Sequence, residues 1–186
     1  MRRNTTRLVP KGNRHLSLGM KILLCGFMGS GKTTLFERIK SKSPEVSCKD
    51  LDQLIEEKLA EPDETLGDVI GRVGWEKFRE VEESLLYQEL SFDGNLLISL
   101  GGGSLTPRLV DEIDTNPEVR LIWLDTDFET CWSRVSDDAG RPLVAKGKDF
   151  LKNLYNERKP LYERASIHLN PHQQGLISNF QQLIEN

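Results

Sequence analysis

One glycine-rich segment near the amino terminus, Gly26–Thr34, constrains the fold more than any other part of the chain. Its sequence, Gly-Phe-Met-Gly-Ser-Gly-Lys-Thr-Thr, fits the phosphate-binding pattern G-x-x-x-x-G-K-[ST]. The apolar residues 22–25 before it are typical of a buried strand, and a helical pattern begins directly after it. A chance glycine-rich turn would lack this context. The segment therefore predicts a nucleotide-phosphate site between a strand and a helix.

The chemistry of such a loop assigns a role to most of its residues. Glycines let the backbone curl so that N–H groups point at phosphate oxygens, and the helix amino terminus adds positive potential. Lys32 supplies a point charge for the β- and γ-phosphates, and the Thr33 hydroxyl can ligate Mg²⁺. The residues expected to contact the nucleotide here are Gly29, Ser30, Gly31, Lys32, Thr33 and Thr34.

Strand-like and helix-like segments alternate along the rest of the chain, which predicts an α/β fold with a mainly parallel sheet. Strands are expected near residues 21–25, 46–49, 95–100, 119–124 and 165–169. Helices are expected near 32–41, 53–59, 65–90 with glycine interruptions, 106–113, 127–135 and 149–163, and a loop at 170–172 leads to a terminal helix ending near 184. No internal repeat or linker interrupts this order, so one compact domain over residues 20–186 is predicted.

Charge and composition exclude several classes of function. The net charge is −4, but residues 1–19 hold five basic residues and no acid, which leaves the remainder near −9. So acidic a body argues against a nucleic-acid partner, because phosphate contacts need a concentrated basic face. No apolar run approaches a membrane span. The three cysteines lack metal-ligand spacing and fit a reducing cytoplasm, and residues 1–19 are expected to be a disordered extension outside the catalytic domain.

A phosphate-binding loop alone does not separate kinases from GTPases and motor-like ATPases. No base-reading motif of the N-K-x-D type occurs in the sequence, and the chain is short for a remodelling ATPase. A small kinase that acts on a small molecule is the remaining class.

Asp50 and Asp52 are the first acceptor-side candidates. Two carboxylates one residue apart at a strand's end point the same way. One could hold Mg²⁺ through water while the other accepts a hydrogen bond from a substrate hydroxyl. Asp is equally favourable as a helix N-cap, so the pair alone leaves both interpretations open. Its position soon after the phosphate-binding loop favours the functional interpretation.

Two further segments suggest a site for an anionic acceptor. Arg79 and Glu82 are spaced so that the carboxylate can orient the guanidinium, although such pairs are common on helix surfaces. An arginine held in this way can grip a substrate carboxylate bidentately. Gly101, Gly102 and Gly103 follow a buried strand directly, and they permit close backbone approach at the edge of the sheet where ligands bind in open α/β folds.

Two arginines complete the set of candidates. Arg141 lies in a polar segment, residues 136–148, that suits a closing loop, where an arginine can stabilise the charge on a transferring phosphoryl group. Arg158 lies in the segment Arg-Lys-Pro-Leu-Tyr on an expected helix, where ordinary solvation of a helix surface is the simpler interpretation.

Together these motifs resemble the shikimate kinase family over essentially all of residues 20–186. The motifs that line up in order are Gly26–Thr34, Asp50-Leu51-Asp52, Phe78-Arg79 with Glu82, Ser99–Gly103, Arg141-Pro142-Leu143 and Arg158–Tyr162. The resemblance implies transfer of the ATP γ-phosphoryl group to the 3-hydroxyl of shikimate in aromatic amino-acid biosynthesis. It also implies a five-stranded parallel sheet, a substrate-binding helical insert at about residues 50–90 and a lid at about 136–148. Because small kinases that close around their substrates often work as monomers, a monomer is expected.

The resemblance also implies residue roles. Asp52 would bind and orient or deprotonate the hydroxyl, and Arg79 and Arg158 would hold the shikimate carboxylate while Gly101–Gly103 line the ring. Lys32 and Arg141 would act on the phosphates, and Asp50 would join Thr33 around Mg²⁺. Arg134 and Pro171 match positions that flank adenine.

Two alternatives remain at this point. A related small-molecule kinase, such as a gluconate kinase, would share the donor half but would have no special need for paired arginines. A non-catalytic nucleotide-sensing module should have lost Lys32, Asp52 or a lid arginine, and the sequence retains all of them.

Overall fold

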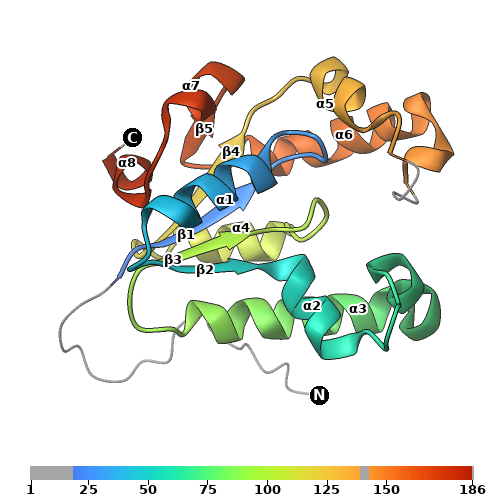
Figure 1. The fold of residues 1–186 in the computed structure, drawn as a ribbon, viewed down its shortest axis with the longest axis horizontal. Helices are drawn as coiled ribbons and strands as arrows, with labels where there is room; N and C mark the ends of the chain where they lie inside the picture. Colours follow the sequence, from blue (N-terminus) through green and yellow to red (C-terminus); the bar gives the residue numbers. More distant parts are fainter. Residues whose placement is uncertain (1–18, 139–142, 186) are drawn as a thin grey trace.

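The computed structural model describes residues 19–138 and 143–185 of the chain. Within them, five parallel strands form one sheet in the order β2-β3-β1-β4-β5 (Figure 1). The strands are β1 (Lys21–Cys25), β2 (Ser47–Asp50), β3 (Leu96–Ser99), β4 (Val119–Leu124) and β5 (Ile167–Leu169). The predicted α/β fold with a five-stranded parallel sheet is confirmed. Residues 1–18 lie outside the described part, so the expected disordered extension stays a prediction.

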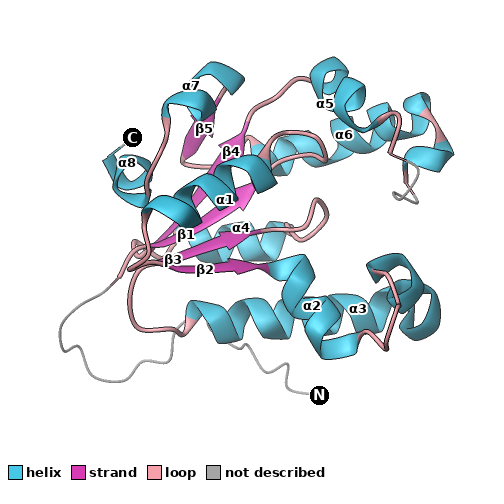
Figure 2. Ribbon diagram, viewed as in Figure 1, coloured by secondary structure: helices cyan, strands magenta, loops and turns pink. Residues whose placement is uncertain are grey.

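Helices cover both faces of the sheet (Figure 2). They are α1 (Lys32–Lys42), α2 (Leu51–Leu59), α3 (Leu66–Leu90), α4 (Pro107–Asp114), α5 (Phe128–Val135), α6 (Lys148–Tyr162), α7 (Pro171–Leu176) and α8 (Phe180–Glu185), with a short 3₁₀ turn, η1 (Val144–Lys146), before α6. The segment 136–148, expected to be a loop, thus contains one turn of helix where the structure describes it.

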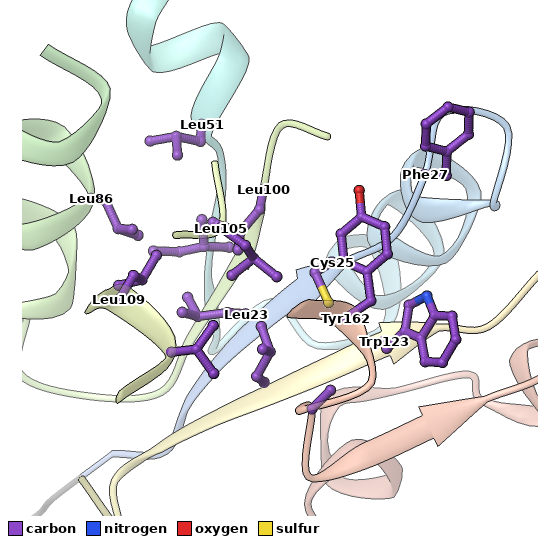
Figure 3. Packing of buried hydrophobic residues seen from close by; sticks show 14 of the residues in the cluster. Leu23, Cys25, Phe27, Leu51, Leu86, Leu100, Leu105, Leu109, Trp123 and Tyr162 are labelled. Carbon is purple, nitrogen blue, oxygen red and sulfur yellow. The ribbon is translucent and has the colours of Figure 1, made fainter. Parts of the chain in front are cut away.

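Alternation along the central strand divides the core into two layers. Ile22 and Leu24 face a cluster that includes Ile39 of α1 and Leu183 of α8. Leu23 and Cys25 face the opposite cluster, which contains residues of α3, α4, α5 and α6 (Figure 3). Side chains of a strand alternate between the faces of a sheet, so the consecutive apolar residues 22–25 require that β1 be covered on both sides. The β1 strand is buried throughout, and this fixes the position of the loop that follows it.

The long helix α3 is interrupted once. A capping box begins it, in which the Thr65 side chain accepts from the Asp68 backbone N–H and the Asp68 carboxylate accepts from the Thr65 N–H. Gly74 has φ 81° and ψ 159°, a left-handed conformation that breaks the helical path. Of the glycine interruptions expected in this segment, the structure places the break at Gly74 and leaves Gly67 and Gly71 helical.

The carboxyl-terminal region differs from the single terminal helix that the sequence predicted. Asn170 caps a helix that starts at Pro171, where the missing N–H of proline costs nothing. This helix stops at Leu176, because Ile177 adopts an extended conformation. The Asn179 side chain then accepts from the Gln182 N–H at 3.1 Å as α8 begins. Two strong local caps therefore split the expected helix into α7 and α8.

Candidate active site

The carboxyl ends of β1, β2 and β3 open into one cavity of about 1200 Å³. Residues from both the nucleotide side and the acceptor side predicted from the sequence line it: Gly29, Gly31, Lys32, Thr33, Thr34, Asp50, Asp52, Arg79, Gly101, Gly102, Gly103, Arg134, Arg158 and Pro171. Arg141 lies outside the described residues. Ser30 does not line the cavity, because its side chain is buried and its N–H donates to the Phe27 carbonyl at 3.1 Å.

The phosphate-binding loop connects β1 to α1 through left-handed glycines. Gly29 has φ 79° and Gly31 has φ 103°, conformations that side-chain-bearing residues rarely adopt. A Cβ at Gly29 would also meet the Cys131 carbonyl oxygen at 2.5 Å. The Lys32 ammonium donates to the carbonyls of Gly26 at 2.7 Å and Phe27 at 3.1 Å, so it folds back across the loop. The loop is therefore shaped as a cradle with a positive charge across it.

Asp50 performs the capping that the sequence left as an alternative. It ends β2, and one carboxylate oxygen accepts from the Asp52 and Gln53 backbone N–H groups at 3.0 and 3.2 Å. Helix α2 starts at Leu51, two residues earlier than expected, so Asp52 belongs to its first turn. The expectation that strand alternation aligns the two carboxylates is therefore wrong. The tight strand-to-helix turn brings both of them to the cavity instead.

Asp52 lies in an environment that disfavours its charge. Burial, together with the nearby Asp50 and Glu82 carboxylates, raises the pKa of Asp52 to about 6. The carboxylate also lies against the glycine loop, since a Cβ at Gly101 would meet an Asp52 oxygen at 2.7 Å. A carboxyl group with a pKa near neutrality is suited to accepting a proton from a hydroxyl.

Glu82 holds Arg79 from the buried side. This carboxylate is 4% exposed, and it accepts from the Arg79 guanidinium and, at 2.6 Å, from the Ser104 hydroxyl. A buried carboxylate with two partners fixes the guanidinium more firmly than a surface pair would. The helix α3 thus presents Arg79 to the cavity in one orientation.

Arg158 of α6 meets Arg79 over the glycine loop. A Cβ at Gly103 would lie 2.7 Å from an Arg79 nitrogen and 2.9 Å from an Arg158 nitrogen. Burial and the Arg79 charge lower the pKa of Arg158, partly opposed by Tyr162, yet a guanidinium stays charged at neutral pH. The Tyr162 hydroxyl donates to the Gly102 carbonyl at 2.7 Å and anchors the loop. Two cations brought together beside one buried carboxylate form a site for an anion.

The opposite end of the cavity is built from the phosphate-binding loop, α5 and α7. Arg134 donates to the Gly29 carbonyl at 2.8 Å. Behind the loop, Thr126 donates to the Ser30 carbonyl at 3.0 Å and accepts from the Gln174 amide at 3.2 Å. This chain of hydrogen bonds joins α7, where Pro171 lines the cavity, to the phosphate-binding loop.

Sequence reasoning missed three residues that support the site. Ser104 and Tyr162 hold the glycine loop and its arginines through side-chain hydrogen bonds. Trp75 lines the cavity beside Arg79. Ser104 directly follows the triple glycine, and Tyr162 is one helical turn from Arg158. These positions in the sequence indicate that both residues lie near the site, but they do not identify the hydrogen-bond partners.

No helix in residues 19–138 and 143–185 is both long and apolar enough to cross a membrane. The described residues contain no group of three or more His, Cys, Asp or Glu side chains that could hold a metal ion by themselves.

The fold and this cavity define a kinase with a phosphate-binding loop, a P-loop kinase. A family model described as shikimate kinase matches residues 28–185, and the chain belongs to the shikimate kinase family. A shikimate kinase of Persephonella marina is 35% identical over 152 residues, covering 80% of this chain and 87% of that protein. One from Lactococcus lactis subsp. lactis is 34% identical, covering 79% and 85%.

Solved structures agree with this family. The crystal structure of shikimate kinase from Bacteroides thetaiotaomicron has a TM-score of 0.73 at 26% identity, covering 89% of this chain and 97% of that one. Shikimate kinase from Acinetobacter baumannii in complex with shikimate has a TM-score of 0.71 at 25% identity, covering 91% and 93%. Family membership assigns shikimate kinase activity, an ATP-dependent phosphotransfer in the shikimate pathway, to this chain.

Proposed function

We propose that this chain transfers the γ-phosphoryl group of ATP to the 3-hydroxyl of shikimate with the residues gathered in the cavity. The observation that carries the assignment is the pair of guanidinium groups over Gly103, in the same cavity as the phosphate-binding loop. Shikimate has one carboxylate and several hydroxyls, so it requires cations at one end and a proton acceptor at the other. Arg79 and Arg158 are proposed to bind the carboxylate bidentately, while the glycine loop lines the ring.

Asp52 is proposed to accept the proton of the reacting hydroxyl. The hydroxyl oxygen forms its bond to the γ-phosphorus as the bond to ADP breaks, and the proton passes to the carboxylate. A pKa of about 6 lets Asp52 be ionised at neutral pH while it remains basic enough to take the proton. Lys32 and the loop N–H groups are proposed to hold the phosphates, with Arg134 and Pro171 beside the adenine. Arg141, outside the described residues, is proposed to reach the phosphates from the lid.

The donors near the phosphate-binding loop fit Mg²⁺. Thr33 offers a hydroxyl, and Asp50 offers a carboxylate that already caps α2 with one of its oxygens. Mg²⁺ keeps several waters and binds proteins through one or two oxygen ligands plus substrate phosphates, so a larger protein cluster is not required. When bound, it neutralises charge that develops on the phosphates.

We also expect a monomer in the cytoplasm. Sedimentation would test the oligomeric state, and cell fractionation would test the location.

ADP release with Mg-ATP tests this assignment against the rival functions. We expect turnover with shikimate and none above background with gluconate, other polyols or nucleoside monophosphates. Turnover with gluconate instead would favour a related sugar kinase, for which the arginine pair has no evident use. Nucleotide binding without any turnover would favour a sensing module and would contradict the proposal.

A further inference from the structure

Trp75 is a large apolar side chain left in an unusual position. It is 54% exposed, whereas Trp123 is buried in the core, and it lines the same cavity as the two arginines. Single exposed apolar residues are common on protein surfaces, but an indole that lines a cavity can contact whatever binds there. Its neighbours indicate what that contact is.

The Arg79 guanidinium lies close to two aromatic rings. Its carbon is 5.2 Å from the centroid of the Trp75 ring and 5.3 Å from that of Phe78. The two rings meet edge to face at 5.8 Å, and Phe78 is buried. Trp75 is therefore the exposed member of a pair of rings that contacts the cation.

The backbone places Trp75 there. Gly74 adopts its left-handed conformation immediately before it, and the helix resumes with Trp75 in the first turn of the second half. A Cβ at Gly74 would meet nothing within 4 Å, so its conformation and not close packing requires glycine. The second half of α3 thus begins with Trp75, and Arg79 follows one helical turn later, within contact distance of the indole.

We infer that Trp75 forms the outer wall of the carboxylate site and contributes to selection of an anionic acceptor, an inference that rests on the proposed function. An indole over a guanidinium restricts its rotation and attracts its charge. It also excludes water from one side of the arginine–carboxylate pair, and a pair in lower effective dielectric attracts more strongly. Nucleotide binding uses the other end of the cavity and gains nothing from this wall.

Kinetics of Trp75→Ala and Trp75→Phe test the inference. We expect Trp75→Ala to raise the KM for shikimate about three- to tenfold while the KM for ATP changes less than about twofold. Trp75→Phe keeps an aromatic face and should stay within about twofold of the unsubstituted enzyme. Phe92→Ala is the matched control, because Phe92 is also an exposed aromatic at 45% but does not line the cavity.

The methyl ester of shikimate separates charge selection from general damage. The ratio of kcat/KM for shikimate to that for the ester should fall about three- to tenfold in Trp75→Ala. The ester has no carboxylate charge, so it does not make the arginine–carboxylate pair that Trp75 is inferred to strengthen. An unchanged ratio would overturn the inference, and so would an equal rise in the KM for shikimate and the KM for ATP. Shikimate should also change the tryptophan emission of the unsubstituted enzyme more than that of Trp75→Phe, and equal changes would count against it. Absent shikimate turnover in the unsubstituted enzyme would overturn the proposed function as well, so the two failures are distinguishable.

Discussion

Asp52 is the residue at which stability and the proposed chemistry oppose each other. Its ordinary pKa of 3.8 rises to about 6 in the folded chain because burial and the neighbouring Asp50, Glu82 and Glu56 carboxylates disfavour the charge. Between these values the unfolded chain has lost a proton that the folded chain keeps. Stability therefore falls as pH rises through this window, and the loss persists at neutral pH. A base of this kind costs folding free energy so long as it is charged.

Replacement of this carboxyl should separate the two effects. We expect Asp52→Asn to lower turnover about 10²- to 10⁴-fold, since the proton acceptor is lost. The same variant should be more stable than the unsubstituted enzyme at pH 7.5 by on the order of 1–3 kcal/mol, because one pKa unit corresponds to about 1.4 kcal/mol. Urea unfolding at pH 7.5 and at pH 3.5 checks this, since the gain should vanish at the lower pH. If the variant differed from the unsubstituted enzyme by the same free energy of unfolding at both pH values, the site would not disfavour the charge of Asp52.

The pH dependence of kcat/KM for shikimate should report the same group. Activity should fall as pH drops through about 6, where Asp52 takes up its proton. The residual activity of Asp52→Asn should lack this acid limb. If the limb persisted unchanged in the variant, another group would have to be the base.

The glycine loop after β3 contacts both parts of the proposed acceptor site, the carboxylate of Asp52 and the arginine pair. A Cβ at Gly101 would meet the Asp52 carboxylate, whereas one at Gly103 would meet both arginines. The loop itself is anchored by Tyr162 at Gly102 and by Ser104 at Glu82. The same short segment therefore touches the proposed base at one end and the proposed carboxylate clamp at the other.

Alanine at the two ends of this loop should affect different kinetic constants. Gly101→Ala should lower kcat about 10- to 100-fold, because a displacement of about 1 Å in a reacting group can cost that much. Gly103→Ala should mainly raise the KM for shikimate, by about tenfold, as the guanidinium groups are pushed aside.

Gly71→Ala provides the control for these variants. A Cβ at Gly71, within α3, meets nothing within 4 Å, so alanine there should leave both constants unchanged. It should raise stability by about 0.5–1 kcal/mol through helix propensity. Identical kinetic profiles for Gly101→Ala and Gly103→Ala would contradict the division of the loop.

The sheet separates two apolar layers, and both must form for the site residues to keep their positions. The layer against α1 and α8 contains no proposed site residue, yet it supports the strand that carries the phosphate-binding loop. Leu183 of α8 is fully buried there, whereas Leu176 at the end of α7 is 65% exposed. The carboxyl-terminal segment is thus part of the core.

These two leucines form a matched test of that conclusion. Leu183→Ala should destabilise the protein by about 2–5 kcal/mol, since it removes buried methyl groups and leaves a cavity. Leu176→Ala should change the free energy of unfolding by less than about 0.5 kcal/mol. Urea unfolding measures both. Similar losses at the two positions would show that burial does not govern stability in this region.

Sequence reasoning reached the parts of the site that depend on local pattern. The left-handed glycines after β1 and the apolar central strands follow from short-range sterics and alternation. It left two roles open at Asp50; the structure shows that this residue caps α2, and its role toward Mg²⁺ stays a proposal. It failed at Ser104 and Tyr162, whose partners are distant in sequence. Long-range hydrogen bonds are set by packing, which a single sequence does not display.

Phe27 belongs to the phosphate-binding loop, yet its ring lies 6.0 Å from the guanidinium carbon of Arg158. The same ring also packs against Phe128 and Tyr155. A shift of the loop on nucleotide binding would therefore move a ring that lies beside Arg158, which is proposed to hold the acceptor. Bound nucleotide would then change the affinity for shikimate, and linkage requires that bound shikimate change the affinity for nucleotide by the same factor. The two substrates would thus bind as thermodynamically coupled ligands, and a nucleotide without its acceptor would be held differently from a nucleotide with it.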